Sequence, residues 1–123
     1  MSGSDIARAA KAFEKEAGHE IPYSEMVCNQ FVLAVLRKTV DAQFPDTIAN
    51  DFVYSHKFTK VDTPNEGDLV HWPGHIGIVL DPNNGEFIGS QTSTGVAVAN
   101  YKNGYWNGSY GGKKPDYFLR WSA

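Results

Sequence analysis

The sequence predicts an α+β fold in which N-terminal helices pack against an antiparallel β-sheet. Helical patterning is confined to the first third of the chain, and short β-type runs separated by turns dominate the second half. The chain has 123 residues, of which 41% are hydrophobic and 13% aromatic, and this is enough apolar material for a core. A single domain over residues 1–123 is therefore expected.

Two helices are expected near the N-terminus. Apolar residues recur at helical spacing over residues 4–17, which is typical of an amphipathic helix. A second helix is expected over residues 24–40. Over residues 27–36 its polar side chains are Asn29 and Gln30 alone, so apolar residues cover nearly the whole circumference. Such a helix lies at the centre of a core, and a cysteine falls in its first turns.

Five strands are expected in the second half of the chain. They are short runs rich in β-branched and aromatic residues, bounded by Gly, Pro and Asn turns. The expected ranges are 69–72, 76–80, 86–91, 96–101 and 117–121. The loop over residues 102–114 is rich in glycine and aromatic residues, which indicates a substrate-facing or packing loop. Residues 41–60 are weakly patterned, and the element indicated there is a short helix over residues 47–52.

The charge pattern excludes several classes of partner. With 11 basic and 14 acidic residues the net charge is -3, and no window holds the cluster of Lys and Arg that binding to phosphates requires. We therefore expect no nucleic-acid partner. No apolar run reaches the ~18–20 residues of a membrane span, and residues 1–20 mix acidic and basic side chains where a signal peptide would be apolar. Neither a membrane span nor a signal peptide is expected.

The lone cysteine is the most informative residue. It cannot form an internal disulfide or a multi-thiolate metal site, so Cys28 is either a buried spectator or a reactive thiol. A free thiol titrates near ~8.5, and a helix N-terminus is expected to lower its pKa by about 0.7 of a unit. Most of the thiol then stays protonated at neutral pH, so catalysis by Cys28 requires a histidine as base.

Four histidines are candidates for that base. His19 and His56 lie in polar stretches and are expected at the surface. His71 alternates with Leu69 and neighbours Trp72, so it is expected in a strand and packed by the Trp72 ring. His75 follows the Pro-Gly turn at residues 73–74 and begins an apolar strand, so it is held at the mouth of that strand and can face a cleft. Because the turn prevents a shared helical face, His71 and His75 are not expected to bind a metal.

The order of five segments carries a family resemblance. They are Pro22-Tyr23, Cys28-Asn29-Gln30-Phe31-Val32, Gly67-Asp68-Leu69-Val70-His71-Trp72, His75-Ile76-Gly77-Ile78-Val79 and Phe87-Ile88. A cysteine on a helix, then Gly-Asp-Leu-Val, then His-x-Gly-Ile is far more specific in combination than any one piece. Over residues 21–121 the chain resembles the NlpC-type cell-wall peptidases of bacteria, and this implies a papain-like fold.

The resemblance implies a cysteine peptidase or amidase that cleaves amide bonds in the stem peptides of peptidoglycan. Cys28 matches the nucleophile, and His75 matches the base that takes its proton. Tyr23 matches a tyrosine near the active site that helps to position the substrate. No cofactor or metal is implied, and a monomer is expected. Two alternatives stay open on the same fold: a non-catalytic cell-wall-binding module, and a related thiol acyltransferase or deamidase.

The group that orients the catalytic histidine departs from the family pattern. Many members carry a second histidine two residues after the Phe of the following strand, where this chain has Gly89. Strand alternation places Gln91 on the same face as Gly89, and its amide oxygen could accept the ring N–H of His75. Ser90 points to the other face unless a bulge intervenes. Gln91, Ser90, a backbone carbonyl and a bare Cys–His pair are the options.

The biological setting is a further expectation from resemblance. A bare catalytic domain without a signal peptide is similar to the amidase effectors that bacteria inject into rivals through type VI secretion. The protein would then be made in the cytoplasm, exported independently of a signal, and act as a toxin in the periplasm of target bacteria. A cognate immunity protein would plug the Cys28 cleft. If the chain is one domain of a longer protein, the argument from the missing signal lapses.

Overall fold

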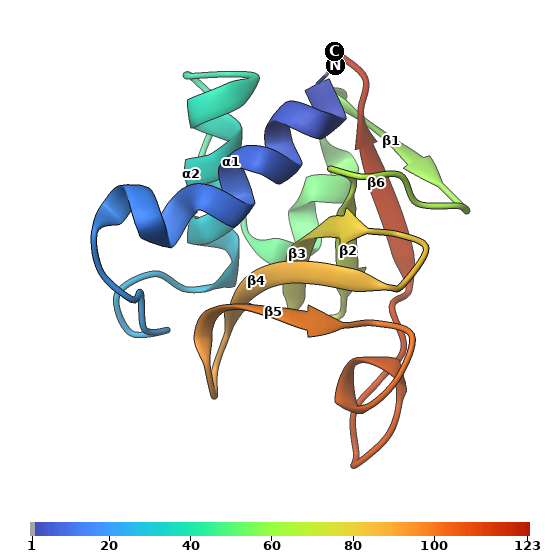
Figure 1. Ribbon diagram of the computed structural model, residues 1–123. Coiled ribbons are helices and arrows are strands. Elements are labelled where there is room, and N and C mark those ends of the chain that lie inside the picture. Colours follow the sequence, from blue (N-terminus) through green and yellow to red (C-terminus); the bar gives the residue numbers. More distant parts are fainter. Residues whose placement is uncertain (1) are drawn as a thin grey trace.

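The structure is a computed structural model that describes residues 2–123 (Figure 1). Its helical elements are α1 (Ser2–Ala17), α2 (Cys28–Thr39) and the 3-10 helices η1 (Ala49–Tyr54) and η2 (Tyr105–Asn107). Its strands are β1 (Phe58–Val61), β2 (Leu69–Trp72), β3 (His75–Asp81), β4 (Glu86–Gln91), β5 (Gly95–Asn100) and β6 (Tyr117–Trp121).

All strand pairs belong to one antiparallel sheet of order β1-β6-β2-β3-β4-β5. The C-terminal strand β6 lies between β1 and β2, while β2 to β5 follow one another as a meander. Figure 1 shows α1 and α2 side by side against the sheet, and α2 contacts β3 and β4. The predicted α+β class, with N-terminal helices on an antiparallel sheet, is confirmed.

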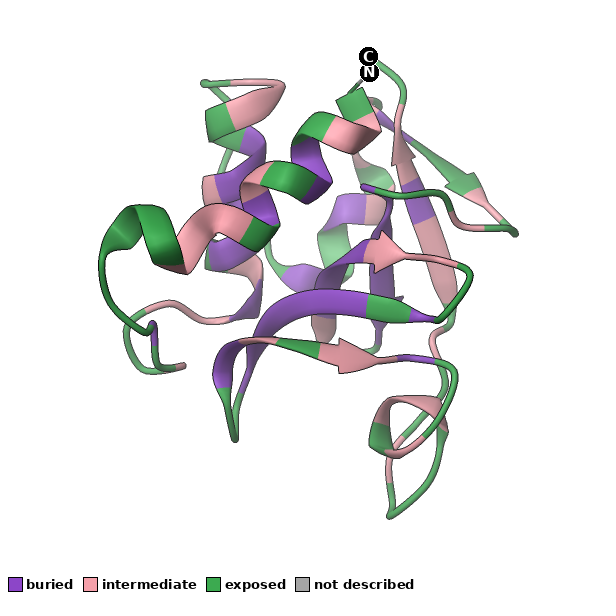
Figure 2. Ribbon diagram, viewed as in Figure 1, coloured by how far each residue is buried: buried purple, intermediate pink, exposed green. Residues whose placement is uncertain are grey.

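The helices cover one face of the sheet and bury the main core. Along α2, Phe31, Val32, Val35 and Leu36 are fully buried, as the sequence predicts for a central helix (Figure 2). A second, smaller core lies on the other face around Val70, Trp72, Val79, Phe87 and Tyr101. Because both faces are covered, every residue of β2 is buried.

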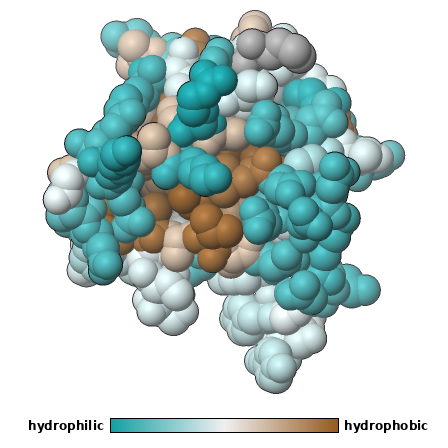
Figure 3. Space-filling view, viewed as in Figure 1, coloured by the Kyte–Doolittle hydropathy of each residue, from teal (hydrophilic) through white to brown (hydrophobic). Residues whose placement is uncertain are grey.

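The surface seen in Figure 3 has hydrophobic side chains at its centre, over β3 and β4, with hydrophilic side chains around them. No helix within residues 2–123 is long and apolar enough to cross a membrane.

Two elements differ from the sequence prediction. Helix α2 begins at Cys28 and not at residue 24, because the carbonyl of Pro22 accepts the N–H groups of Glu25 and Met26 and closes a separate turn. Strand β1 was not expected, since its residues show no clear alternation. It forms because it pairs with β6, some sixty residues away, and because Phe58 is buried against other aromatic rings.

The remaining boundaries shift slightly. The short helix expected over residues 47–52 is η1, which lies two residues later. The strands expected at 69–72, 86–91 and 117–121 are observed with those bounds, whereas β3 is one residue longer at each end and β5 lies one residue earlier.

Candidate active site

Cys28 is the first residue of α2, and neighbouring side chains fix the start of that helix. The side chain of Gln30 accepts the N–H of Val27 at 3.0 Å, which is half of a capping box. The hydroxyl of Ser90 donates to the carbonyl of Met26, so β4 holds the residues that lead into the helix. Cys28 is consequently buried, with 6% of its surface exposed.

The thiol of Cys28 is held in its protonated form by burial. Burial raises the pKa of the Cys28 thiol, and the N–H groups of Ile76, Asn29 and Cys28 itself lower it by less. The expectation that the helix N-terminus would lower this pKa is therefore wrong in its net sign, because desolvation of the thiolate outweighs the helix end. The thiol proton has a weak acceptor in the carbonyl of Gly74, which lies 4.0 Å from Sγ.

His75 begins β3 and is enclosed by aromatic rings. Its imidazole stacks on Trp106, with ring centres 4.6 Å apart and planes 20° from parallel. The indole N–H of Trp72 donates to the carbonyls of Trp106 and Lys113, so the glycine-rich loop is held over the histidine. Burial, more than any other cause, lowers the pKa of His75 to about 4. His75 is therefore neutral at pH 7 and able to accept a proton.

The structure brings Cys28 and His75 to the same corner of the fold. The residues that flank His75 both lie near the sulfur: the Gly74 carbonyl is 4.0 Å from Sγ, and the N–H of Ile76 is near enough to lower the pKa of the thiol. The first turn of α2 thus lies against the first residues of β3. A thiol, a neutral imidazole and the N–H groups of a helix N-terminus are the components that acyl transfer through a cysteine requires.

The Gln91 side chain folds back toward His75 over the space left by Gly89. Its Nε2 donates to the carbonyl of Ala97 at 3.2 Å, which fixes the orientation of the amide. A Cβ at position 89 would lie 2.6 Å from Gln91 Oε1, so the absence of a side chain at Gly89 makes room for that oxygen.

Gln91 Oε1 and His75 Nε2 are the buried side-chain polar atoms that lack a hydrogen bond within residues 2–123. No hydrogen bond of normal geometry joins them, yet the Gln91 side chain is near enough to raise the pKa of His75 against the larger effect of burial. One atom is an acceptor and the other can carry a proton, so the two are complementary. Ser90 is fully buried on the other face of β4 and donates to Met26 instead.

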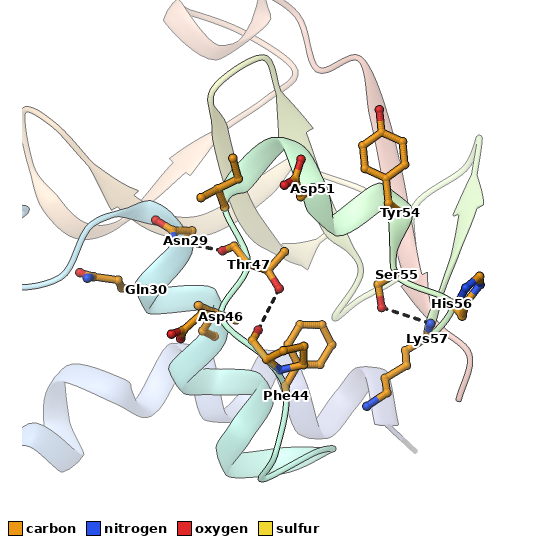
Figure 4. Close-up of a pocket in the computed structure, with 13 residues that line it drawn as sticks. Asn29, Gln30, Phe44, Asp46, Thr47, Asp51, Tyr54, Ser55, His56 and Lys57 are labelled. Atoms are coloured by element: carbon orange, nitrogen blue, oxygen red, sulfur yellow. Dashed lines mark hydrogen bonds between the residues drawn. The ribbon is translucent and has the colours of Figure 1, made fainter.

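Tyr23 lies half-buried in the turn that precedes α2, five residues before Cys28. On the η1 side, a groove of about 690 Å³ begins at the residue after Cys28 (Figure 4). The amide of Asn29 donates to the carbonyl of Thr47 at 3.0 Å and so joins the two walls of the groove. Asp51, among the residues that line it, supplies a carboxylate. Cys28 and His75 do not line this groove, which therefore lies beside the corner that holds them.

Sequence reasoning missed two contributors to the site. The glycine-rich loop was expected to face substrate or to pack, but its pattern does not reveal that Trp106 stacks on His75. Asn50, in a weakly patterned segment, accepts the N–H of Gly74 at 2.8 Å and so holds the turn before His75. His71 is a strand residue, as expected, but the ring that stacks on it is Tyr117 and not Trp72, which contacts His75 instead.

Within residues 2–123 no three His, Cys, Asp or Glu side chains are grouped so that they could hold a metal ion. Among known families, the model described as NlpC/P60 family matches residues 12–114, a range that contains Cys28, His75 and Gln91.

Proposed function

Because the chain belongs to the NlpC/P60 family, whose members are cell-wall peptidases and amidases, we propose that it hydrolyses an amide bond in the stem peptides of peptidoglycan. The observation that carries the proposal is the position of Cys28 Sγ beside both neighbours of His75: it is 4.0 Å from the Gly74 carbonyl and near enough to the Ile76 N–H for that group to lower the pKa of the thiol. A buried thiol at a helix N-terminus thus adjoins the backbone of the residue that supplies a neutral base, as a cysteine nucleophile requires.

The reaction proceeds in two steps. His75 removes the thiol proton as Sγ attacks the amide carbonyl, and the N–H of Cys28 donates to the oxyanion that forms. The C–N bond breaks, and the imidazolium gives its proton to the leaving amine. Water then attacks the thioester while His75 takes a proton from it, the C–S bond breaks, and that proton returns to sulfur. The products are a carboxylic acid, an amine and the original thiol.

Gln91 is proposed as the group that orients His75. When Nε2 of His75 carries the proton and donates to Gln91 Oε1, the lone pair is on Nδ1, the nitrogen on the opposite side of the ring. An amide oxygen also stabilises the imidazolium that forms during attack. The complementary pair of unpaired buried atoms supports this role, and so does the room that Gly89 leaves for Oε1.

Substrate contacts are proposed on both sides of the catalytic corner. Tyr23 is proposed to position the stem peptide from the turn before α2. The groove beside Asn29 is lined by Asp51, whose carboxylate would attract an amino group of the substrate.

Digestion of purified peptidoglycan tests the proposal. Wild type should release peptide fragments that mass spectrometry assigns to one cleaved amide bond, and Cys28→Ala and His75→Ala should release none above background. His19→Gln, a change at an exposed imidazole outside the site, is the matched control and should keep full activity. If the wild-type protein releases no more fragments than Cys28→Ala, the hydrolase proposal fails.

The same samples separate the alternative functions. A non-catalytic wall-binding module is favoured by the lack of a normal hydrogen bond to His75, and it would sediment with peptidoglycan without releasing fragments. An acyltransferase would leave products that carry a new amide bond. A deamidase would release ammonia from a side-chain amide without cleaving the peptide chain.

The biological setting is a separate proposal that rests on the resemblance to secreted amidase effectors. The protein would act as an antibacterial toxin in the periplasm of target cells, and an immunity protein would block the Cys28 cleft. Expression with an added periplasmic signal should arrest growth in wild type and not in Cys28→Ala. Unimpaired growth with wild type would count against the toxin role while leaving the hydrolase proposal intact.

A further inference from the structure

His71 is a buried imidazole with close partners at both ring nitrogens. It lies in β2 with 3% of its surface exposed, and its ring stacks on Tyr117 with ring centres 4.4 Å apart. Nδ1 is 2.7 Å from Oδ1 of Asp116, and Nε2 is 3.0 Å from Oδ1 of Asn50. Because the ring is enclosed, His71 cannot reach a substrate.

Both partners of His71 are acceptors. The carboxylate of Asp116 has no proton to donate. The amide of Asn50 could be turned, but its Oδ1 also accepts the N–H of Gly74 at 2.8 Å, and a turned amide would set two donors against each other. A neutral imidazole carries one N–H, so one of its two contacts would join two acceptors. Both contacts are satisfied when both ring nitrogens carry a proton.

We propose that His71 is a buried imidazolium, paired with Asp116, that holds Asn50 and through it the Gly74 turn against Cys28. Asn50 comes from η1, so the chain of contacts joins three segments that are far apart in the sequence. Its last member is the Gly74 carbonyl, 4.0 Å from Cys28 Sγ. His71 is thus a positioning residue for the catalytic corner, and its effect on turnover rests on the proposed function.

Several charged or titratable groups surround His71. Asp116, whose side chain is 38% exposed, supplies the counter-charge. Lys60 from β1 lies over the outer ring of the stack, with Nζ 4.9 Å from the centre of Tyr117. From η1, Asp51 and Tyr54 are close enough for their charges to raise the pKa of Tyr117, and on β3 the pKa of His75 is lowered by a positive charge on His71.

The pairing with Asp116 decides which contact fails when His71 loses a proton. The carboxylate keeps the Nδ1 proton, because a charge-assisted hydrogen bond is stronger than one to an amide oxygen. Nε2 is then the nitrogen that is deprotonated, and it faces Asn50 Oδ1 without a proton. Without the Nε2 proton the contact between His71 and Asn50 fails, and the link to Gly74 is lost with it.

Nitrogen NMR of the wild-type protein labelled with ¹⁵N-histidine tests the charge state without any substrate. At pH 7 both ring nitrogens of His71, assigned by loss of signal in His71→Gln, should show the shifts of protonated nitrogen. As the pH is raised, Nε2 should lose its proton, and the backbone amide resonance of Gly74 should titrate with the same midpoint. An unprotonated ring nitrogen at pH 7, or a Gly74 amide that does not follow His71, would overturn the proposal.

Two variants separate charge from geometry. In Asp116→Asn, a neutral His71 can donate to Asn50 from Nε2 and accept the new amide N–H at Nδ1. The pH dependence of the Gly74 amide resonance should therefore disappear, while the turn at Gly74 stays in place. Asn50→Leu cuts the link, so the Gly74 amide should stop following His71, and kcat should fall about tenfold with little change in KM.

Thermal unfolding monitors the stability of both variants. If His71 only stabilised the fold, the unfolding temperature of these variants would change, and the backbone amide resonance of Gly74 would depend on pH as it does in wild type. That result would refute the positioning role. If peptidoglycan is not a substrate, the NMR results still decide the charge state and the link.

Discussion

Replacement of Gly89 by alanine tests whether Gln91 orients His75. The new Cβ would lie 2.6 Å from Gln91 Oε1, whereas ordinary contacts begin at 3.4 Å, so the amide oxygen must move by about 0.8 Å. The other neighbours of that Cβ, in Gly77 and Ile76, are backbone atoms at 3.4 Å and need not shift. The substitution therefore displaces one flexible side-chain end and leaves the sheet in place.

The expected magnitude follows from the charge that develops on His75. Loss of a hydrogen bond to a charged group costs about 1.5–3 kcal/mol, and each ~1.4 kcal/mol is a factor of ten in rate. Gln91→Ala, which removes the acceptor, should lower kcat roughly 10- to 100-fold. Gly89→Ala should lower kcat about tenfold. Its free energy of unfolding should change by less than about 1 kcal/mol, because alanine in a strand gains about 0.5–1 kcal/mol over glycine and offsets the crowding.

The assay is the rate of fragment release from peptidoglycan for Gly89→Ala, Gln91→Ala and the double variant, with thermal unfolding of each. If alanine at position 89 acts by displacing the amide, it should change kcat less than about twofold once Gln91 is already alanine. An equal loss of kcat with and without the Gln91 side chain would refute this reasoning. Unchanged activity in Gln91→Ala would remove Gln91 from the mechanism altogether.

Three further predictions concern the protonation states and the stability of the site. Because the pKa of His75 is lowered to about 4, kcat should persist at pH 5–6 and fall as His75 is protonated near pH 4, and a half-loss of kcat at pH 6–7 would contradict this. The free energy of unfolding should also decrease as the pH is lowered toward 4, because the histidine of the unfolded chain takes up a proton at a higher pH than that of the folded protein. Trp106→Ala exposes the imidazole of His75 and should raise its pKa, so the acidic limb of the pH–rate profile should move to higher pH. If the acidic limb does not move, the stacked indole ring does not set this pKa. Arg120→Ala removes two hydrogen bonds to the buried carboxylate of Asp68. It should lower the free energy of unfolding by about 2–4 kcal/mol in denaturant unfolding and leave kcat of the folded protein unchanged. A change in kcat would mean that this ion pair affects the geometry of the active site.

Most of the fold could be predicted from local pattern. The apolar run along α2 and the short runs of β-branched and aromatic residues in β2, β3 and β4 each carry a strong signal, because a helix or strand that is covered on both faces must be apolar on both. Strand β1 carries no such signal. It exists because β6 offers an edge to pair with and because Phe58 enters a cluster with Phe44, Phe52 and Trp121. Strand β6, which contains Trp121, lies some sixty residues away in the sequence.

For the site, the sequence by itself determined which residues are available and on which elements they lie. A single cysteine at the head of an apolar helix and a histidine after a Pro-Gly turn follow from spacing alone, as does the shared strand face of Gly89 and Gln91. These features depend on local geometry, because helix and strand periods fix the direction of each side chain.

The tertiary structure alone decided the environment of those residues. Burial reverses the expected direction of the Cys28 pKa and keeps His75 neutral, because the cost of desolvating a charge depends on every segment that surrounds it. The contact of Trp106 with His75 and the chain of contacts from Asp116 to Gly74 likewise join residues more than twenty positions apart, which no local pattern encodes.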